Sequence, residues 1–285
     1  MGMVSLKQLI KTINDLPALP HVVVQVMKLS EDPDSTAQDI NNVLTQDQSM
    51  TARVLRLANS AFYGFPRRIS TVTDAVVLLG FRTIRSIVLA ASVSEILNQE
   101  IGGYALEPGE LWRHSQSSAI AARIIAKRIK YPAVDVAYTA ALLHDIGKVI
   151  LNNNMKEVYR EVVEKVENTD VPFNEVEIEI MGFDHAQVGA QVAEKWNLPP
   201  ELVEAIMFHH EPEKATIKKK LTAIVHIADF VSVTMGIGVG IDGMLYPISS
   251  EAMDLLGINE IDIESVISEM ADVVSDQQSF AIDKL

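Results

Sequence analysis

Histidines and carboxylates recur in one ordered series through the middle of this 285-residue chain, and they constrain its fold more than any other feature. Five of the seven histidines belong to the series, together with three acidic residues. Its eight members are Glu110, His114, His144, Asp145, His185, His209, His210 and Asp229. Imidazole and carboxylate groups bind divalent metal ions. Because the members include two adjacent pairs and one pair four residues apart, the sequence predicts a protein built around a metal cluster, or a descendant of one.

The number of donors indicates more than one ion. A divalent ion takes roughly four to eight ligands with waters included, so this set suits a pair of ions bridged by Asp145. Two ions about 3.5–4 Å apart would clamp a phosphoryl group and activate a bridging water, which makes Asp145 a candidate catalytic residue. With nitrogen and oxygen donors alone, Fe, Mn, Ni, Zn and Mg are all candidates.

Lys148 is the second candidate catalytic residue. It follows His144 by four residues and therefore lies on the same face of a predicted helix, where it would anchor a phosphate oxygen. The alternative is an ordinary solvated lysine. A lone histidine such as His185 is also more often a core or surface residue than a ligand, so the prediction depends on the whole ordered set. His226, one turn before Asp229, is interpreted as a packing residue or a support for a ligand.

Hydrophobic periodicity indicates helix in nearly every segment, and no run of alternating strand residues is present. Helices are predicted, among others, over residues 109–129, 134–152 and 200–209. The predicted fold is therefore all-α.

The predicted organisation has three parts. The stretch Gly102-Gly103 to Pro108 is the best candidate boundary, because glycine and proline interrupt regular elements. We expect an N-terminal helical bundle over residues 1–105, packed on a metal-ligand lobe over residues 106–240. A C-terminal extension over residues 241–285 would contain a helix near 261–275.

Composition limits the class of protein. The net charge of −14 argues against general binding to nucleic acid, which needs a positive surface. The absence of cysteine excludes disulfides and thiolate ligands. No apolar stretch is long enough to cross a bilayer, and the N-terminus makes a poor signal peptide, so we expect a cytoplasmic protein without membrane contacts. Residues 51–90 hold six arginines against one acidic residue, and this basic segment either docks an acidic partner or is an ordinary solvated surface.

The segment Gly238-Val-Gly-Ile-Asp-Gly243 matches the GxGxxG dinucleotide fingerprint. The fingerprint needs a preceding strand and a βαβ unit, whereas this segment follows a predicted helix. It is interpreted as a loop, and we expect no nucleotide cofactor there.

Two sets of motifs carry a resemblance to known families. The order His…His-Asp…His…His-His…Asp, with Leu142-Leu-His-Asp-Ile-Gly-Lys148, resembles HD-type metal phosphohydrolases. The chain is more closely similar to the HDOD family, the HD-related output domain of bacterial signalling, over roughly residues 8–235. The similar segments are Leu16–Pro20, Asp47–Ser60, Ala75–Gly80, Asp184–Gly189 and Trp196–Pro199.

The resemblance implies an all-α fold and a regulatory output module that acts through a protein partner. All eight positions used by the related HD-GYP phosphodiesterases have a match, so it also allows an active metal-dependent phosphohydrolase with a phosphate-containing ligand. Those enzymes continue into Gly-Tyr-Pro, whereas here Glu211 to Thr216 read Glu-Pro-Glu-Lys-Ala-Thr. The departure argues against cyclic-di-GMP hydrolysis. The first hypothesis is thus a signalling module that retains its metal site, and the second is a phosphohydrolase.

Overall fold

A computed structural model describes residues 6, 18–60, 63, 68–169, 171–240 and 247–275 of the chain. Helices and their connections account for all these ranges, and the only β-type contact within them is an isolated bridge between Ile101 and Leu106. The prediction of an all-α fold is confirmed. None of the helices in the described ranges has the length and apolar character that crossing a bilayer requires.

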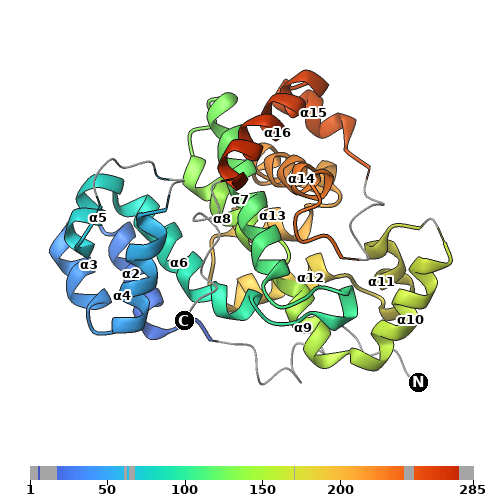
Figure 1. Cartoon of the computed structure of the whole chain (residues 1–285), viewed down its shortest axis with the longest axis horizontal. Coiled ribbons are helices and arrows are strands. Elements are labelled where there is room, and N and C mark those ends of the chain that lie inside the picture. The colour runs from blue at the N-terminus through green and yellow to red at the C-terminus, as the bar shows by residue number, and fades with distance from the viewer. Residues whose placement is uncertain are drawn as a thin grey trace. The chain divides into compact units, whose positions relative to one another are not determined.

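Residue contacts divide the chain into two compact units (Figure 1). Among the described residues, the smaller unit takes in those from 18 to 96 and from 271 to 275, and the larger unit takes in residue 6 and those from 97 to 270. The helices of the smaller unit are α2 (His21–Glu31), α3 (Ala37–Leu44), α4 (Gln48–Ala58), α5 (Val72–Leu79) and α6 (Phe81–Leu97).

The core of the smaller unit follows from apolar residues three or four positions apart, which share one helix face. The fully buried residues are Val23 and Val26 on α2, Ile40 and Leu44 on α3, and Met50 and Val54 on α4. Each such side chain contributes about 1.5–3 kcal/mol when it leaves water. Local signals fix the helix starts: Thr36 accepts from the Asp39 amide, and the Asp39 carboxylate accepts from the Thr36 amide, a reciprocal N-terminal cap.

The larger unit holds the remaining helices, and the last of them, α16, runs on past its boundary. They are α7 (Glu110–Arg128), α8 (Val134–Leu143), α9 (Ile146–Asn154), α10 (Lys156–Glu167), α11 (Phe173–Met181), α12 (His185–Lys195), α13 (Pro200–Met207), α14 (Lys219–Thr234), α15 (Ser250–Leu256) and α16 (Glu260–Ser275), with short 3-10 turns η2 (Gly102–Tyr104) and η3 (Pro212–Lys214). Helix α7 packs against α8 and α14, while α12 packs against α9 and α13 (Figure 1).

The structure corrects two predicted helices. The helix expected over 134–152 is interrupted at His144 and Asp145, and the one expected over 200–209 ends at Met207. In both places a histidine Nδ1 lies within hydrogen-bond distance of the carbonyl three residues earlier: His144 on Ala141 at 2.6 Å and His209 on Ile206 at 2.7 Å. The carbonyls of a last helical turn lack intrahelical partners, so the ring N–H can complete the helix end.

Gly147 lets α9 and α12 cross closely. A Cβ at this position would lie 2.9 Å from the carbonyl carbon of His185 and 2.7 Å from the amide nitrogen of Gly189. Both distances are shorter than real Cβ contacts, and backbone cannot move aside as a flexible side chain can. The glycine of the His-Asp-Ile-Gly-Lys motif therefore has a packing role, and it sets the position of His185.

We expect Gly147→Ala to destabilise the protein by about 3 kcal/mol, because overpacking a tight contact costs about 1–3 kcal/mol even where side chains can relax. The free energy of unfolding in urea measures the effect. Gly102→Ala is the matched control, since its nearest neighbouring atom would be 3.9 Å away. Equal stability of the two variants would contradict this account of the helix crossing.

Candidate metal centre

Seven of the eight predicted ligands meet in one cluster inside the larger unit. His114 comes from α7, the His144-Asp145 pair from the α8–α9 junction, and His185 from the first residue of α12. The His209-His210 pair follows α13, and Asp229 lies on α14. Neighbouring imidazole rings have centroids 4.0–5.5 Å apart through the series His114, His144, His209, His210 and His185.

Asp145 lies between two halves of the cluster. Its Oδ2 is 3.5 Å from His114 Nε2 and 3.4 Å from His144 Nε2. Its Oδ1 is 3.5 Å from His185 Nε2 and 3.9 Å from His209 Nε2. Three groups of side chains have potential ligand atoms within 4.8 Å of one another: His114 with His144 and Asp229, His185 with His209 and His210, and His144 with Asp145 and His209. The third group joins the other two through Asp145.

Hydrogen bonds at Nδ1 aim the Nε2 atoms of four histidines at the centre. His114 Nδ1 is 3.1 Å from the carbonyl of Ile237, and the Nδ1 atoms of His144 and His209 face the carbonyls already described. A carbonyl oxygen only accepts, so each of these nitrogens carries a proton. In the neutral form of each ring the Nε2 lone pair is then left facing the centre. His185 is fixed in the same way by a carboxylate, 2.7 Å away on Glu177. A hydrogen bond of this kind is the usual support for a metal-bound histidine.

The unsatisfied atoms of the cluster provide a test of whether a metal fits. His144 Nε2, His209 Nε2 and Asp145 Oδ1 are buried and have no hydrogen-bond partner among the described residues. Leaving such atoms buried and unpaired is costly, and all three would be satisfied by a divalent cation. The residues present therefore fit a metal ion with nitrogen and oxygen ligands.

The charge states of the Asp145 and Asp229 carboxylates and of His209 suit metal binding, which requires carboxylates and neutral imidazoles. Burial opposes ionisation of Asp145, but His144 and Lys148 outweigh it and hold the pKa of this carboxyl well below its usual range. The pKa of Asp229 is likewise lowered, because His144 and His114 outweigh its burial. Burial, together with the neighbouring imidazoles, lowers the pKa of His209 well below its usual value. At His114, burial lowers the pKa but Asp229 outweighs it and raises this pKa, so a metal ion would have to displace a proton from that ring.

Glu110 is the predicted ligand that these contacts do not bring into the cluster. It begins α7 and is half-buried, and its carboxylate accepts a hydrogen bond from the Glu107 amide at 3.1 Å. As its spacing from His114 predicts, both residues lie on α7. The described hydrogen bond of the Glu110 carboxylate, however, is to the backbone just before the helix and not to the cluster. A ligand role for Glu110 stays a prediction.

Lys148 is a buried residue of the cluster. Its Nζ donates to Asp145 Oδ2 at 2.6 Å and lies 5.2 Å from the centre of the Tyr104 ring. Only 6% of Lys148 is exposed, so the alternative of a solvated surface lysine is excluded. The ammonium group is positioned beside the carboxylate that joins the two halves of the cluster.

Sequence reasoning missed a buried network behind His185. Glu177 on α11 accepts hydrogen bonds through Oε1 from the hydroxyls of Tyr104 and Tyr159, and through Oε2 from the backbone N–H and ring of His185. Burial lowers the pKa of His185, but Glu177 outweighs it and raises this pKa to about 9. One signal was present, because Glu177 lies in the apolar stripe of α11 that includes Phe173, Val176 and Met181.

The loop after α14 supports the opposite half of the cluster. It includes Ile237, which faces His114 Nδ1, and Gly238, whose φ is +56°. A Cβ on Gly238 would be 2.9 Å from His114 Cβ, so this glycine permits close contact with α7. The rest of the GxGxxG match, from residue 241 on, lies outside the described residues. His226, interpreted from the sequence as a packing residue or a support for a ligand, lies with its Nδ1 2.8 Å from the carbonyl of His209.

Comparison with known proteins decides the family. A family model described as HDOD domain matches residues 16–212. The chain belongs to the HDOD family. This HDOD protein is 27% identical over 199 residues to an uncharacterized protein of Treponema pallidum, and 32% identical over 123 residues to ribonuclease Y of Geotalea uraniireducens. Those matches cover 70% and 43% of this chain but only 38% and 18% of the relatives, so the chain spans well under half the length of these curated proteins.

Solved structures share the fold over nearly the whole chain. An HDOD domain protein of unknown function from Geobacter sulfurreducens aligns with a TM-score of 0.77 and 26% identity, and 96% of this chain covers 95% of that one. A protein from Shewanella amazonensis, proposed to be a phosphohydrolase, aligns with a TM-score of 0.75 and 28% identity, with 95% and 96% coverage.

Glu177→Gln tests the support of His185. We expect metal affinity to fall about 10- to 100-fold, the usual cost of removing a partner behind a ligand, because the neutral amide no longer holds the imidazole in its ligating orientation as strongly. Competition with a chelator measures the affinity. Glu204→Gln is the matched control: Glu204 is also a buried acid, but it accepts from the amides of Thr216, Ile217 and Lys218. Equal metal affinity in both variants would contradict the role given to Glu177.

Proposed function

We propose that this chain is a regulatory signal-transduction module of the HDOD type, in which two divalent ions are held in the larger unit. The two halves of the cluster would each bind one ion, with Asp145 as the bridge and Glu110 completing the set from α7. The module would act in the cytoplasm through contact with a protein partner. The absence of a Gly-Tyr-Pro segment after His210 supports regulation over cyclic-di-GMP hydrolysis.

The burial of the cluster is the observation that carries this proposal. His144, His185 and His209 have no exposed surface, and Asp145 has 1%. A hydrolase must bring a phosphoester and water to its metal ions, which requires access from solvent. A buried centre between six helices is instead suited to hold the larger unit in one conformation. Metal binding to the folded state stabilises it in proportion to affinity.

The partner is proposed to be an acidic protein that contacts the smaller unit. Val77 and Leu78 on α5 are 72% and 53% exposed, although both are large apolar residues. Adjacent exposed apolar side chains are typical of a contact surface. In the basic segment, Arg53 and Arg85 pair with Glu95 and Glu31, while Arg68 and Arg82 are exposed. Arg67 lies outside the described residues.

A metal-dependent phosphohydrolase is the second candidate, and Lys148 favours it. An ammonium group beside the bridging carboxylate would be placed to hold a phosphate oxygen, and Asp145 would orient the water. Bound ions would supply the Lewis acid and the activated hydroxide. Likeness to a protein proposed to be a phosphohydrolase supports the same reading.

Asp145→Asn separates the two functions. We expect the variant to lose metal, because Asn offers one neutral oxygen where the carboxylate offers two charged ones. In a regulatory module, wild-type protein with its full metal content should not hydrolyse phosphomonoesters, cyclic dinucleotides or short RNA above the blank. Elemental analysis and product assays of both proteins measure these outcomes.

Asp47→Asn is the matched control, since Asp47 caps α4 in the smaller unit and asparagine caps helices about as well. Wild-type turnover that is retained in Asp47→Asn and lost in Asp145→Asn would refute the regulatory proposal and establish the phosphohydrolase. Unchanged metal content in Asp145→Asn would refute the bridge.

A further inference from the structure

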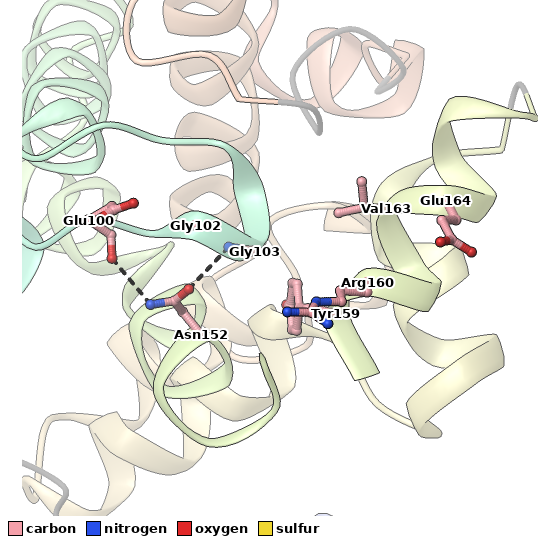
Figure 2. Close-up of a pocket in the computed structure, with 8 residues that line it drawn as sticks. All are labelled: Glu100, Gly102, Gly103, Asn152, Tyr159, Arg160, Val163 and Glu164. Carbon is pink, nitrogen blue, oxygen red and sulfur yellow. Dashed lines mark hydrogen bonds between the residues drawn. The ribbon is translucent and has the colours of Figure 1, made fainter. Parts of the chain in front are cut away.

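A cavity of about 510 Å³ lies between the η2 segment and α10 in the larger unit (Figure 2). Glu100, Gly103 and Asn152 contribute to one side, and Tyr159 and Arg160 of α10 contribute to the other. The volume falls within the range of small-molecule sites, about 300–1,000 Å³. No residue of the metal cluster lines the cavity.

The wall of the cavity is held in place by the Asn152 side chain. Its Oδ1 accepts from the Gly103 amide at 3.1 Å, and its Nδ2 donates to the Glu100 carbonyl at 3.2 Å (Figure 2). Gly103 lies directly against Tyr159, because a Cβ on Gly103 would be 2.5 Å from a ring carbon of that tyrosine. The backbone on this side of the cavity is therefore preformed, which lowers part of the entropic cost of binding.

Charges of both signs line the cavity. Glu100 lies on the η2 side, while Arg160 and Glu164 project from α10 (Figure 2). All three residues are exposed, and none of their side chains makes an ion pair or hydrogen bond with another described residue. A purely cationic ligand would displace water from Arg160 without forming an ion pair with it. A purely anionic ligand would displace water from Glu100 and Glu164 without forming an ion pair with either. Charged groups that lose water without gaining a partner oppose binding.

We propose that this cavity binds a small zwitterion of the amino-acid type. The ligand's ammonium group would face Glu100, its carboxylate would face Arg160, and its side chain would lie on Val163, beside the almost fully buried ring of Tyr159. Each charge of the ligand then meets an opposite charge, and its apolar part meets the apolar part of the wall.

The same tyrosine connects the cavity to the metal centre. Tyr159 lines the cavity with its ring and donates its hydroxyl proton to Glu177, and Glu177 accepts from His185. A ligand that shifts the ring also shifts the partner of His185. This coupling rests on the proposed metal centre, whereas binding in the cavity does not. Because coupling between two sites is reciprocal, metal must change ligand affinity by the factor by which ligand changes metal affinity.

Calorimetric titration of the full chain with the twenty protein amino acids tests the binding site. At least one should bind saturably at millimolar concentration or tighter. The amine and the acid that each lack one charge of that ligand should bind at least 10-fold more weakly; for leucine these are isopentylamine and 4-methylpentanoate. Arg160→Gln should also weaken binding at least 10-fold, while Arg113→Gln, an exposed arginine of α7 outside the cavity, should not.

Repeating the titration on chelator-stripped and metal-reloaded protein tests the coupling. We expect the two affinities to differ roughly 5-fold or more, as is typical of coupled sites. Tyr159→Phe keeps the ring and removes the hydroxyl that contacts Glu177, so it should reduce the difference between the two affinities toward none. Thermal unfolding checks that each variant folds.

The outcomes separate the two proposals. If no amino acid binds, or if a single-charge analogue binds as tightly, the zwitterion site is refuted whatever the metal content. If binding depends on Arg160 but is equal with and without metal, the coupling is refuted and the site stands. If the reloaded protein retains no metal, the proposed metal centre fails together with the coupling, while the Arg160 comparison still decides the binding site.

Discussion

The orientation of the buried imidazoles is the constraint on which the larger unit depends. Four rings give their Nδ1 protons to carbonyl or carboxylate oxygens, so in the neutral rings the Nε2 lone pairs are directed toward the centre around Asp145. A group of inward lone pairs is unfavourable without a cation among them. The helices α7, α8, α9, α12, α13 and α14 all carry or adjoin a residue of the cluster, so the orientation of the rings constrains how these helices pack against one another.

The fold class and the candidate residues of the cluster could be named from the sequence, because helical periodicity and ligand spacing are local properties of the chain. Adjacent ligands such as His144-Asp145 are visible as a pair. The break between α8 and α9 at this pair is harder to predict. The residues from Ala141 to Lys148 have the pattern of one continuous helix, and only the structure shows the His144 ring at the end of α8. Glu110 shows the opposite limit: its spacing from His114 is correct for a shared face, but the described contacts engage its carboxylate at the helix start.

The supporting network could not be predicted in the same way. Glu177 is separated from its tyrosine partner Tyr104 by 73 positions, and no local sequence pattern predicts a contact between residues so far apart. Burial of a carboxylate in an apolar helix face was the available signal, and it becomes interpretable only when the structure shows that Glu177 contacts His185. Gly147 is similar, because the motif identifies the glycine but only the crossing of α9 and α12 explains why no side chain fits.

The wide spacing of the cluster along the chain has a consequence for folding. Its members lie between His114 and Asp229, and the chain contains no cysteine. An ion bound to them would tie five separate chain segments to one point, as a covalent crosslink does, and would close loops of tens of residues whose entropy favours the unfolded chain. The metal would then act in the larger unit as a reversible crosslink. Its formation would depend on the supply of ions, whereas a disulfide crosslink depends on an oxidising environment.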